Sequence, residues 1–307
     1  MTTMPILNVA IAGASGALGS AVLCKLIATP HLNVRVLRNL GSRSVYPTGV
    51  EVTDVGYSST EELTRALAGQ HALVSTVGAP GILSQIQLID ACVAAGVKRF
   101  IPSDFGVDLD NPNAQKLPLF VPKFKIHQYL VDKSNATGIS YTYIYTGSFL
   151  DWGFENNMSF DALNDTPTIV GDGNLPFSGI LLPTAGEAVV GVLNSLAATK
   201  NRAVFVRDFV TTQNELLAMA RRIDPERCYE PAYAELADLQ DAADDRLAQG
   251  LYDMETFRPY IYRAMFDPAY RCEPLPLDNK LLNISEKMES DLEEAMRVTL
   301  SGSVKIS

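Results

Sequence analysis

Three glycines at regular intervals constrain the fold of this chain more than any other feature. The stretch "ILNVAIAGASGALGSAVLCKLI" places Gly13, Gly16 and Gly19 where an apolar, β-rich run gives way to a helical pattern. Glycine permits a tight strand-to-helix turn, and the free amides and dipole of a helix N-terminus stabilise an anionic ligand. The context predicts a dinucleotide-binding turn, and the alternative is a glycine-rich turn without a ligand. The predicted contacts are Gly13, Ser15, Gly16, Ala17, Leu18 and Gly19.

The periodicity of residues 6–145 predicts the fold. Apolar runs alternate with helix-period segments, and several runs, such as "ALVSTVG", are continuously apolar, as in parallel strands covered on both faces. We therefore expect an α/β fold, a Rossmann-type doubly wound parallel sheet, in a domain of residues 1–150 to which 184–206 return. Residues 151–183 and 207–307 are expected to form a smaller, mostly helical C-terminal substrate lobe. "FRPYIYRAMF" could close one side of the substrate site.

The end of the predicted second strand distinguishes NADH from NADPH. A carboxylate there would bind the ribose 2′-hydroxyl, but "VRVLRNLGSR" has no acidic residue and supplies Arg38 and Arg43. The sequence therefore favours NADPH, or NADP+, as the cofactor of the first domain; the alternative is that both arginines are ordinary surface charges. "STVGAP" ends the fourth predicted strand, so Val77 and Gly78 are expected beside the cofactor.

Composition excludes several other classes of function. The 307 residues carry 25 Lys and Arg against 35 Asp and Glu, and this net charge of −10 argues against direct nucleic-acid binding. Three histidines and four cysteines lack metal-ligand spacing, so no metal is expected. No apolar run approaches the roughly 20 residues that span a bilayer, and residues 1–7 lack signal-peptide features, which favours the cytosol. The predicted partner is a small molecule, and both monomer and homodimer remain open.

At "GVKRFIPSDFG", residues 96–106, the chain begins to resemble a known family. Together with the glycine turn, the arginine closing strand two, "ILSQIQLIDACVAAG", a K-x-x-[IV] helix, a G-I-x-Y-T strand and a later G-D-G, it resembles the NmrA-like, isoflavone reductase-like branch of atypical short-chain dehydrogenases. The resemblance implies NADPH-dependent reduction of small, often aromatic, plant or fungal metabolites. The family also holds NADP-binding members that act as redox-sensing regulators, so fold alone does not decide function.

The stretch "VPKFKIHQYLVDK" offers two candidate proton-transfer groups. Tyr129 and Lys133 form a Y-x-x-x-K pair, but Lys133 lies only six residues before the strand expected from Ile139, whereas Lys123 lies sixteen before it. Ten residues of helix separate the two lysines by roughly 15 Å, so they cannot serve the same nicotinamide. In the register of Lys123 the tyrosine position is Leu119, and the ordinary Tyr-Lys pair is absent.

Lys123 with Ile126 is similar to the K-x-x-[IV]-R-R pattern of the isoflavone reductase-like enzymes, which implies that Lys123 is the catalytic lysine. His127 and Gln128 replace the two arginines. A lysine ammonium beside the nicotinamide and ribose could bind the substrate oxygen or deliver a proton. The alternatives for Lys123 are a ribose anchor or a solvated helix face.

Further contacts are expected where strands five and six end, because open α/β sheets bind ligands at the carboxyl ends of their strands. The predicted cofactor contacts are Ser103, Phe105, Lys123, Ser148 and Phe149. The predicted substrate contacts are Trp152, Phe154, Asn156, Met158 and His127, several of which could equally be core. The favoured function is an NADPH-dependent reductase of a small conjugated or aromatic secondary metabolite. The alternatives are a non-catalytic NADP(H)-sensing regulator that binds a partner protein, and a non-redox isomerase or cyclase.

Overall fold

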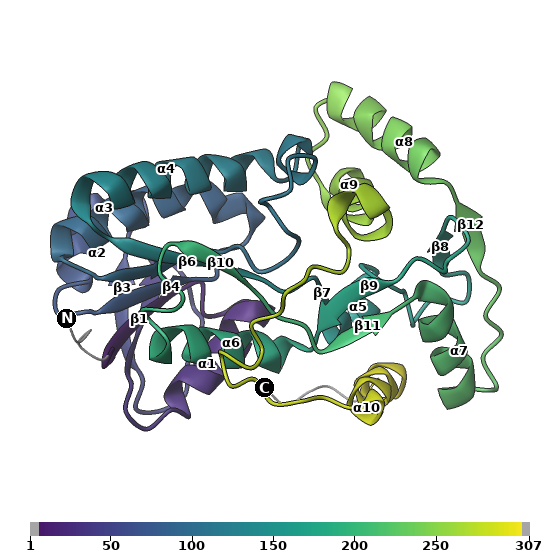
Figure 1. Ribbon diagram of the computed structural model, residues 1–307, viewed down its shortest axis with the longest axis horizontal. Coiled ribbons are helices and arrows are strands. Elements are labelled where there is room, and N and C mark those ends of the chain that lie inside the picture. Colours follow the sequence, from purple (N-terminus) through teal and green to yellow (C-terminus); the bar gives the residue numbers. More distant parts are fainter. Residues whose placement is uncertain (1–5, 303–307) are drawn as a thin grey trace.

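The glycine turn joins the first strand of a parallel sheet, β1, to the helix that follows it, α1 (Figure 1). The computed structural model describes residues 6–302. The seven-stranded sheet has the order β10-β6-β5-β4-β1-β2-β3, and each neighbouring pair is parallel. Its strands are β1 Asn8–Ala12, β2 Asn33–Asn39, β3 Glu51–Val55, β4 Ala72–Ser75, β5 Arg99–Ile101, β6 Ser140–Tyr145 and β10 Arg202–Phe205. From β1 the chain adds β2 and β3 on one side of the sheet and then β4, β5, β6 and β10 on the other. This reversal confirms the prediction of a doubly wound sheet.

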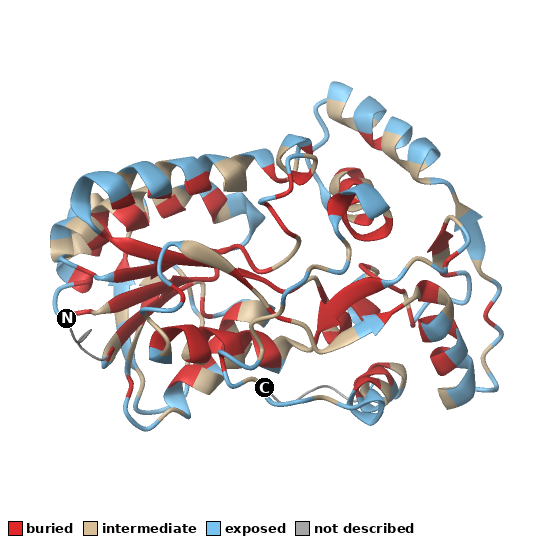
Figure 2. Cartoon of the chain, in the orientation of Figure 1, coloured by how far each residue is buried: buried red, intermediate tan, exposed pale blue. Residues whose placement is uncertain are grey.

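Helices cover both faces of this sheet. On one face α2, α3 and α4 pack over the first core cluster, and on the other α1 and α6 pack over the second. The helices are α1 Ala17–Ile27, α2 Thr60–Ala66, α3 Gln85–Ala95, α4 Val121–Thr137 and α6 Leu182–Asn194, with short 3₁₀ helices η1 Ala79–Ser84 and η2 Ala114–Lys116. Figure 2 shows the strands and the inner helix faces buried, as expected for apolar stripes that meet the sheet.

Residues 182–205 return to the sheet domain. Helix α6 packs against α1 so closely that a Cβ on Gly186 would lie 2.9 Å from the carbonyl oxygen of Ala21. Strand β10 then extends the sheet at its β6 edge, with Val204 opposite Ile144. The assignment of the two parts to cofactor and substrate remains a proposal.

The C-terminal lobe has its own core of aromatic and aliphatic side chains, including Phe154, Phe177 and Phe266. Its helices are α5 Leu150–Asn156, α7 Gln213–Ile223, α8 Leu236–Ala248, α9 Met254–Phe266 and α10 Glu289–Leu300, with η3 Pro268–Tyr270. Two small sheets, which the sequence did not predict, join β7 Ser148–Phe149, β9 Phe177–Ile180 and β11 Phe209–Thr211, and β8 Thr168–Val170 with β12 Ala232–Ala234. These strands have two to four residues, too few to show a period in the sequence.

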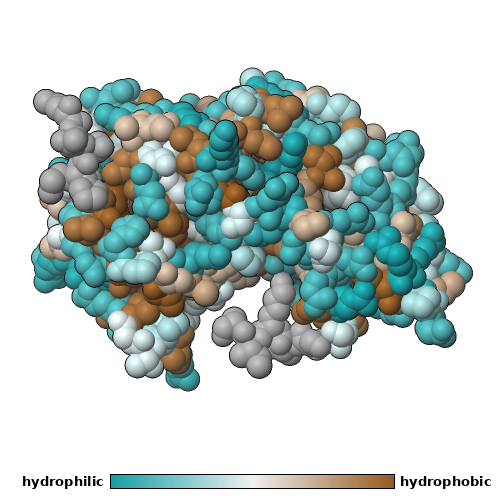
Figure 3. Space-filling view, turned by 60° about the horizontal axis from the view of Figure 1, so that its bottom comes forward, coloured by the Kyte–Doolittle hydropathy of each residue, from teal (hydrophilic) through white to brown (hydrophobic). Residues whose placement is uncertain are grey.

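The surface differs between the two parts. In Figure 3 the face over the lobe is largely hydrophilic, and hydrophobic atoms gather more over the sheet domain. Among residues 6–302, no helix is long and apolar enough to cross a membrane. The same residues contain no group of three His, Cys, Asp or Glu side chains that could hold a metal ion. The stretch expected to lack signal-peptide features lies mostly outside the described residues.

Candidate functional site

The glycine turn is held by backbone contacts that only glycine permits. Gly13 has φ +84°, and a Cβ there would lie 2.7 Å from the Thr76 carbonyl oxygen. A Cβ on buried Gly19 would lie 2.1 Å from the Gly13 carbonyl oxygen. Gly16 differs, because a Cβ there would meet nothing closer than 3.8 Å. Gly13 and Gly19 are therefore required by packing of β1, α1 and β4, whereas no contact within the described chain requires Gly16.

The N-terminus of α1 offers free hydrogen-bond donors. Gly16 is its N-cap and has no side chain to cap the helix, and the amides of Ala17 and Leu18 have no acceptor among residues 6–302. The Gly13 amide is already used, since it donates to the Tyr57 hydroxyl at 3.2 Å. Tyr57 donates in turn to the Leu37 carbonyl at 2.7 Å, and burial raises its pKa to about 12. The exposed Ser15-Gly16-Ala17 segment thus presents its amides to solvent, as an anion site would require.

The two predicted phosphate-binding arginines have different surroundings. Arg38 makes a bidentate ion pair with Asp54 on β3, with Nε–Oδ1 and Nη2–Oδ2 distances of 2.6 and 2.8 Å. The hydrogen bond between them raises the pKa of Arg38 and lowers that of Asp54. Arg43 is exposed and has no ion-pair partner within the described residues. The sequence reading missed Asp54, which lies on a neighbouring strand opposite Arg38 in the β2–β3 register.

The ends of β4 and β5 meet beside the glycine turn. The Ser103 hydroxyl donates to the Val77 carbonyl at 2.9 Å, and the Ser103 amide donates to Gln85 Oε1 at 2.8 Å. Gly78 is exposed and is the N-cap of the 3₁₀ helix η1. Phe105 is only 5% exposed and belongs to the core cluster beneath α1 and α6. Gly78 is therefore the most open of the residues predicted at this edge, and Phe105 supports the site from inside.

Lys123 lies in the first turn of α4, at the same edge of the sheet. Its side chain is half-buried, and within residues 6–302 its ammonium has no hydrogen-bond or ion-pair partner. Burial lowers the pKa of Lys123, and the negative charge of Asp104 partly opposes this shift. A desolvated ammonium of this kind releases its proton more readily than a solvated one.

Tyr129 and Lys133 form a separate cluster between α3 and α4. The Tyr129 hydroxyl and the Lys133 ammonium both contact Asp90 of α3, each at 2.6 Å from Oδ1. The Lys133 ammonium also lies 5.1 Å from the centroid of the Tyr129 ring. This Y-x-x-x-K pair links α3 to α4, and its contacts are those of a structural ion pair.

One turn after Lys123, His127 belongs to a buried polar group. Its Nε2 donates to Oδ2 of Asp104, and the two side chains are only 6% and 2% exposed. The ring stacks on Tyr143 of β6, with centroids 3.8 Å apart and planes inclined by 10°. Burial raises the pKa of the Tyr143 phenol far above its ordinary value. Asp104 is the acidic residue of the "PSDFG" stretch, and sequence reasoning did not single it out.

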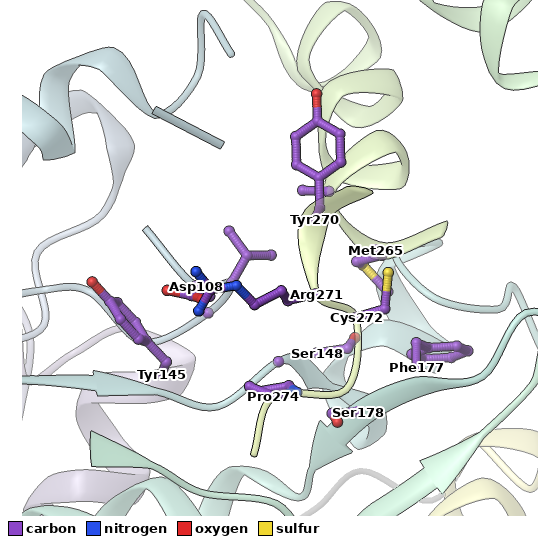
Figure 4. A pocket seen from close by; sticks show the side chains of 14 residues that line it. Asp108, Tyr145, Ser148, Phe177, Ser178, Met265, Tyr270, Arg271, Cys272 and Pro274 are labelled. Carbon is purple, nitrogen blue, oxygen red and sulfur yellow. The ribbon is translucent and has the colours of Figure 1, made fainter. Parts of the chain in front are cut away.

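A pocket lies between the sheet domain and the lobe (Figure 4). Its cavity volume is about 20 Å³, room for little more than one water molecule, and its walls come from the loop after β5, the end of β6, β9 and the segment from α9 to Pro274. Gly147 (φ +65°) brings the β6 end against β9, because a Cβ there would lie 2.3 Å from the Ser178 carbonyl oxygen. The lining residues include Tyr145, Ser148, Phe177, Ser178, Met265, Tyr270 and Cys272. Met265 comes from the aromatic helix that the sequence suggested for this side.

An ion pair stands at one side of this pocket. Arg271 Nη1 lies 3.0 Å from Oδ2 of Asp108, whose side chain is fully buried while that of Arg271 is 57% exposed. Figure 4 shows the Arg271 side chain reaching toward Asp108, with Tyr145 beyond it. Desolvation raises the pKa of Asp108, and the charge of Arg271 acts against that shift. The ion pair comes from segments far apart in the sequence, so no local pattern could have indicated it.

The residues predicted as substrate contacts are dispersed. Phe154 is fully buried in the lobe core, Met158 is 7% exposed, and the exposed Asn156 amide donates to the Trp152 carbonyl at 2.8 Å. None of these four residues lines the pocket described above. Phe154 is buried because α5 turns its apolar side toward α7, α9 and α10. Of the predicted residues, Ser148 lines the pocket, Phe149 packs on the second core cluster, and His127 lines a groove beside α4.

Comparison with curated proteins gives relatives of fungal and plant origin. An oxidoreductase named aprR from Aspergillus flavus is 34% identical over 220 residues, 71% of this chain and 74% of the relative. The oxidoreductase poxI of Penicillium oxalicum is 34% identical over 219 residues, 69% of this chain and 68% of the relative. Isoflavone reductase from Cicer arietinum is 31% identical over 56% of this chain and 55% of its own length.

Solved structures share the fold at lower sequence identity. A leucoanthocyanidin reductase–NADPH complex from Vitis vinifera superimposes with a TM-score of 0.75 at 23% identity, covering 94% of this chain and 99% of that one. AtPrR2 with NADP+ and (+)pinoresinol gives a TM-score of 0.76 at 21% identity, covering 97% and 100%. The model of the NmrA-like family matches residues 7–220, well over half of the chain. The chain therefore belongs to the NmrA-like family.

Proposed function

We propose that this protein is an NADPH-dependent reductase of a small conjugated or aromatic metabolite, with Lys123 as its positioning or proton-transfer residue. The observation that carries the proposal is the desolvated ammonium of Lys123, which has no partner within residues 6–302 and lies at the carboxyl edge of the sheet that also carries Gly16 and Gly78. The oxidoreductase names of the fungal relatives and the NADPH and NADP+ named for the solved structures support it.

The residues present fit a dinucleotide. The pyrophosphate would lie against the free amides of Ala17 and Leu18, where Gly16 leaves the backbone open. Arg43 is the cation best available for the 2′-phosphate, because Asp54 already neutralises Arg38. Bound NADPH would supply the hydride. The chain's own contribution would be to stabilise charge on the substrate oxygen through Lys123.

A direct test follows NADPH absorbance while the purified protein is offered enones, quinone methides and benzylic ethers. We expect turnover with at least one class and a loss of about 10²-fold or more in kcat for Lys123→Ala, the size typical of a lost general acid. Lys125→Ala is the matched control, since Lys125 is an exposed residue of the same helix. Tight NADPH binding without turnover across the panel would instead favour a regulator, and turnover that survives in Lys123→Ala would exclude Lys123 as the proton-transfer group.

Cofactor preference tests the phosphate site separately. Arg43→Ala is expected to lower the preference for NADPH over NADH, while Asp54→Asn is expected to raise it because Arg38 is then freed to bind the phosphate. The readout is the ratio of dissociation constants from fluorescence titrations. An unchanged ratio in both variants would place the 2′-phosphate elsewhere.

A further inference from the structure

His127 connects two environments. On one side its Nε2 contacts Asp104, and on the other the ring lines a groove of about 730 Å³ that runs between α4, β6 and β10. The groove residues are Asp110, Phe124, His127, Gln128, Val131, Asp132, Tyr141, Tyr143, Asn201, Arg202 and Ala203. Lys123 is not among the described residues that line it. His127 therefore lies between the solvent of this groove and the interior of the candidate site.

Asp104 interacts with both His127 and Lys123. Its carboxylate accepts from His127, and its charge acts on the Lys123 ammonium. Asp104 and Lys123 share no direct hydrogen bond in the described part of the chain, so a water must bridge them for a proton to pass. Stacking on Tyr143 holds the imidazole in place.

We propose that His127 and Asp104 return a proton from the groove to Lys123 after each turnover. This relay rests on the proposed function, in which each reduction adds one hydride and one proton to the substrate and the proton comes from the Lys123 ammonium. Nε2 of His127 then gives its proton to the Asp104 carboxylate, and the carboxyl group passes a proton through the bridging water to the neutral amine. The second ring nitrogen of His127 takes one proton from groove water, and the imidazole returns to its Nε2–H tautomer by proton exchange with water before the next turnover. Per turnover one proton leaves solvent and one enters product.

Titratable and charged groups surround His127 on several elements. They are Asp104 after β5, Tyr143 on β6, Asp110 in the loop before α4, Arg202 on β10, and Lys123 and Asp132 on its own helix. The steady-state rate should fall as pH rises, because the relay takes its protons from groove water.

His127→Gln is the informative variant, because a glutamine amide can still donate to Asp104 but cannot carry a proton. Lys123 already holds its proton before the first cycle, so we expect a first turnover at the wild-type rate, followed by a steady-state kcat lowered by about tenfold or more. A larger solvent isotope effect should accompany the slow phase. Lys125→Ala serves as the control. A merely structural role for His127 would slow the first turnover as well, and that result would overturn the relay.

Chemical rescue by added imidazole provides an independent test of the proton route. In His127→Ala the groove should admit imidazole, which is expected to restore steady-state turnover in proportion to its concentration, while His127→Gln, whose side chain fills the site, should not respond. Thermal unfolding of both variants checks that they fold. Absence of rescue in a folded His127→Ala protein would contradict the relay.

A measurement without turnover tests the inner step. The pH dependence of Lys123 acylation by an amine-reactive reagent, followed by mass spectrometry, reports the protonation of its ammonium. Asp104→Asn should lower the midpoint because the facing negative charge is removed, whereas His127→Gln should leave it unchanged. An unaltered midpoint in Asp104→Asn would overturn the relay even if Lys123 is required. Wild-type turnover in Lys123→Ala would instead refute the proposed function itself.

Discussion

The glycine turn allows stability and cofactor binding to be separated by two single substitutions. At Gly19 an added Cβ would lie 2.1 Å from the carbonyl oxygen of Gly13, so helix α1 has to move away from the turn. Overpacking of this kind costs typically 1–3 kcal/mol, and about 1 kcal/mol is regained because alanine is the better helix former. Since the contact is with backbone, we expect the upper end of that range and a net loss of about 2 kcal/mol.

Gly16→Ala should behave differently. Its φ of −77° suits any L-residue, and its Cβ would meet nothing closer than 3.8 Å. Alanine caps a helix less well than glycine, so we expect a loss of about 1 kcal/mol. The new methyl would cover the free amides of Ala17 and Leu18, and losing one charge-assisted hydrogen bond there should weaken NADPH binding by about tenfold or more.

Thermal unfolding and NADPH fluorescence titration of the same two variants provide the assay. For a chain of this size, 1 kcal/mol corresponds to about 2 °C in Tm, so Gly19→Ala should melt about 4 °C below the wild type and Gly16→Ala within about 2 °C. The reasoning would be refuted by a Gly16→Ala protein that binds NADPH as tightly as the wild type. It would also be refuted if both variants lost the same stability.

Three further predictions concern charged groups. Arg99 is buried and donates to Ser140 Oγ, Thr199 Oγ1 and the Leu196 carbonyl. Arg99→Met leaves these acceptors unpaired, so the free energy of unfolding measured in urea should fall by about 3 kcal/mol. A loss below about 1 kcal/mol would contradict this. Lys133→Ala should leave kcat unchanged and cost about 1 kcal/mol or less, since it breaks a partly exposed ion pair and a contact with the Tyr129 ring. A large fall in kcat would return the Y-x-x-x-K pair to the site. The folded-state pKa of Asp108 is raised, so its charge costs stability above the unfolded pKa, and removing Arg271 raises that pKa further. Arg271→Ala should therefore lower Tm more at about pH 8 than at about pH 4, and an equal effect at both would be evidence against it.

Much of the sheet domain could be predicted from sequence because its information is local. Continuous apolar runs, helix periods and three spaced glycines predict parallel strands, covering helices and the turn that joins them, and the structure bears this out for β1 to β6. The position of Lys123 in the first turn of α4 likewise follows from counting residues back from β6. Its catalytic role stays a prediction.

The small sheets of the lobe could not be predicted in the same way. Strands of two to four residues hold no period, and their pairing joins segments as distant as Thr168–Val170 and Ala232–Ala234. The aromatic residues of "SFLDWGFENNM" show the same limit. Whether an aromatic side chain enters a core or a pocket depends on what packs against it, and for Phe154 the packing of α7, α9 and α10 decided for the core.

The sequence by itself determined the α/β architecture, the glycine turn and the lysine at the sheet's carboxyl edge, because each depends on residues within one or two neighbouring elements. Only the tertiary structure decided which charges meet. Asp54 lies opposite Arg38 on a neighbouring strand, Asp104 contacts His127, and Arg271 reaches Asp108 from the far end of the chain. Electrostatic energies depend on distance and burial in space, and neither quantity is encoded by spacing along the chain.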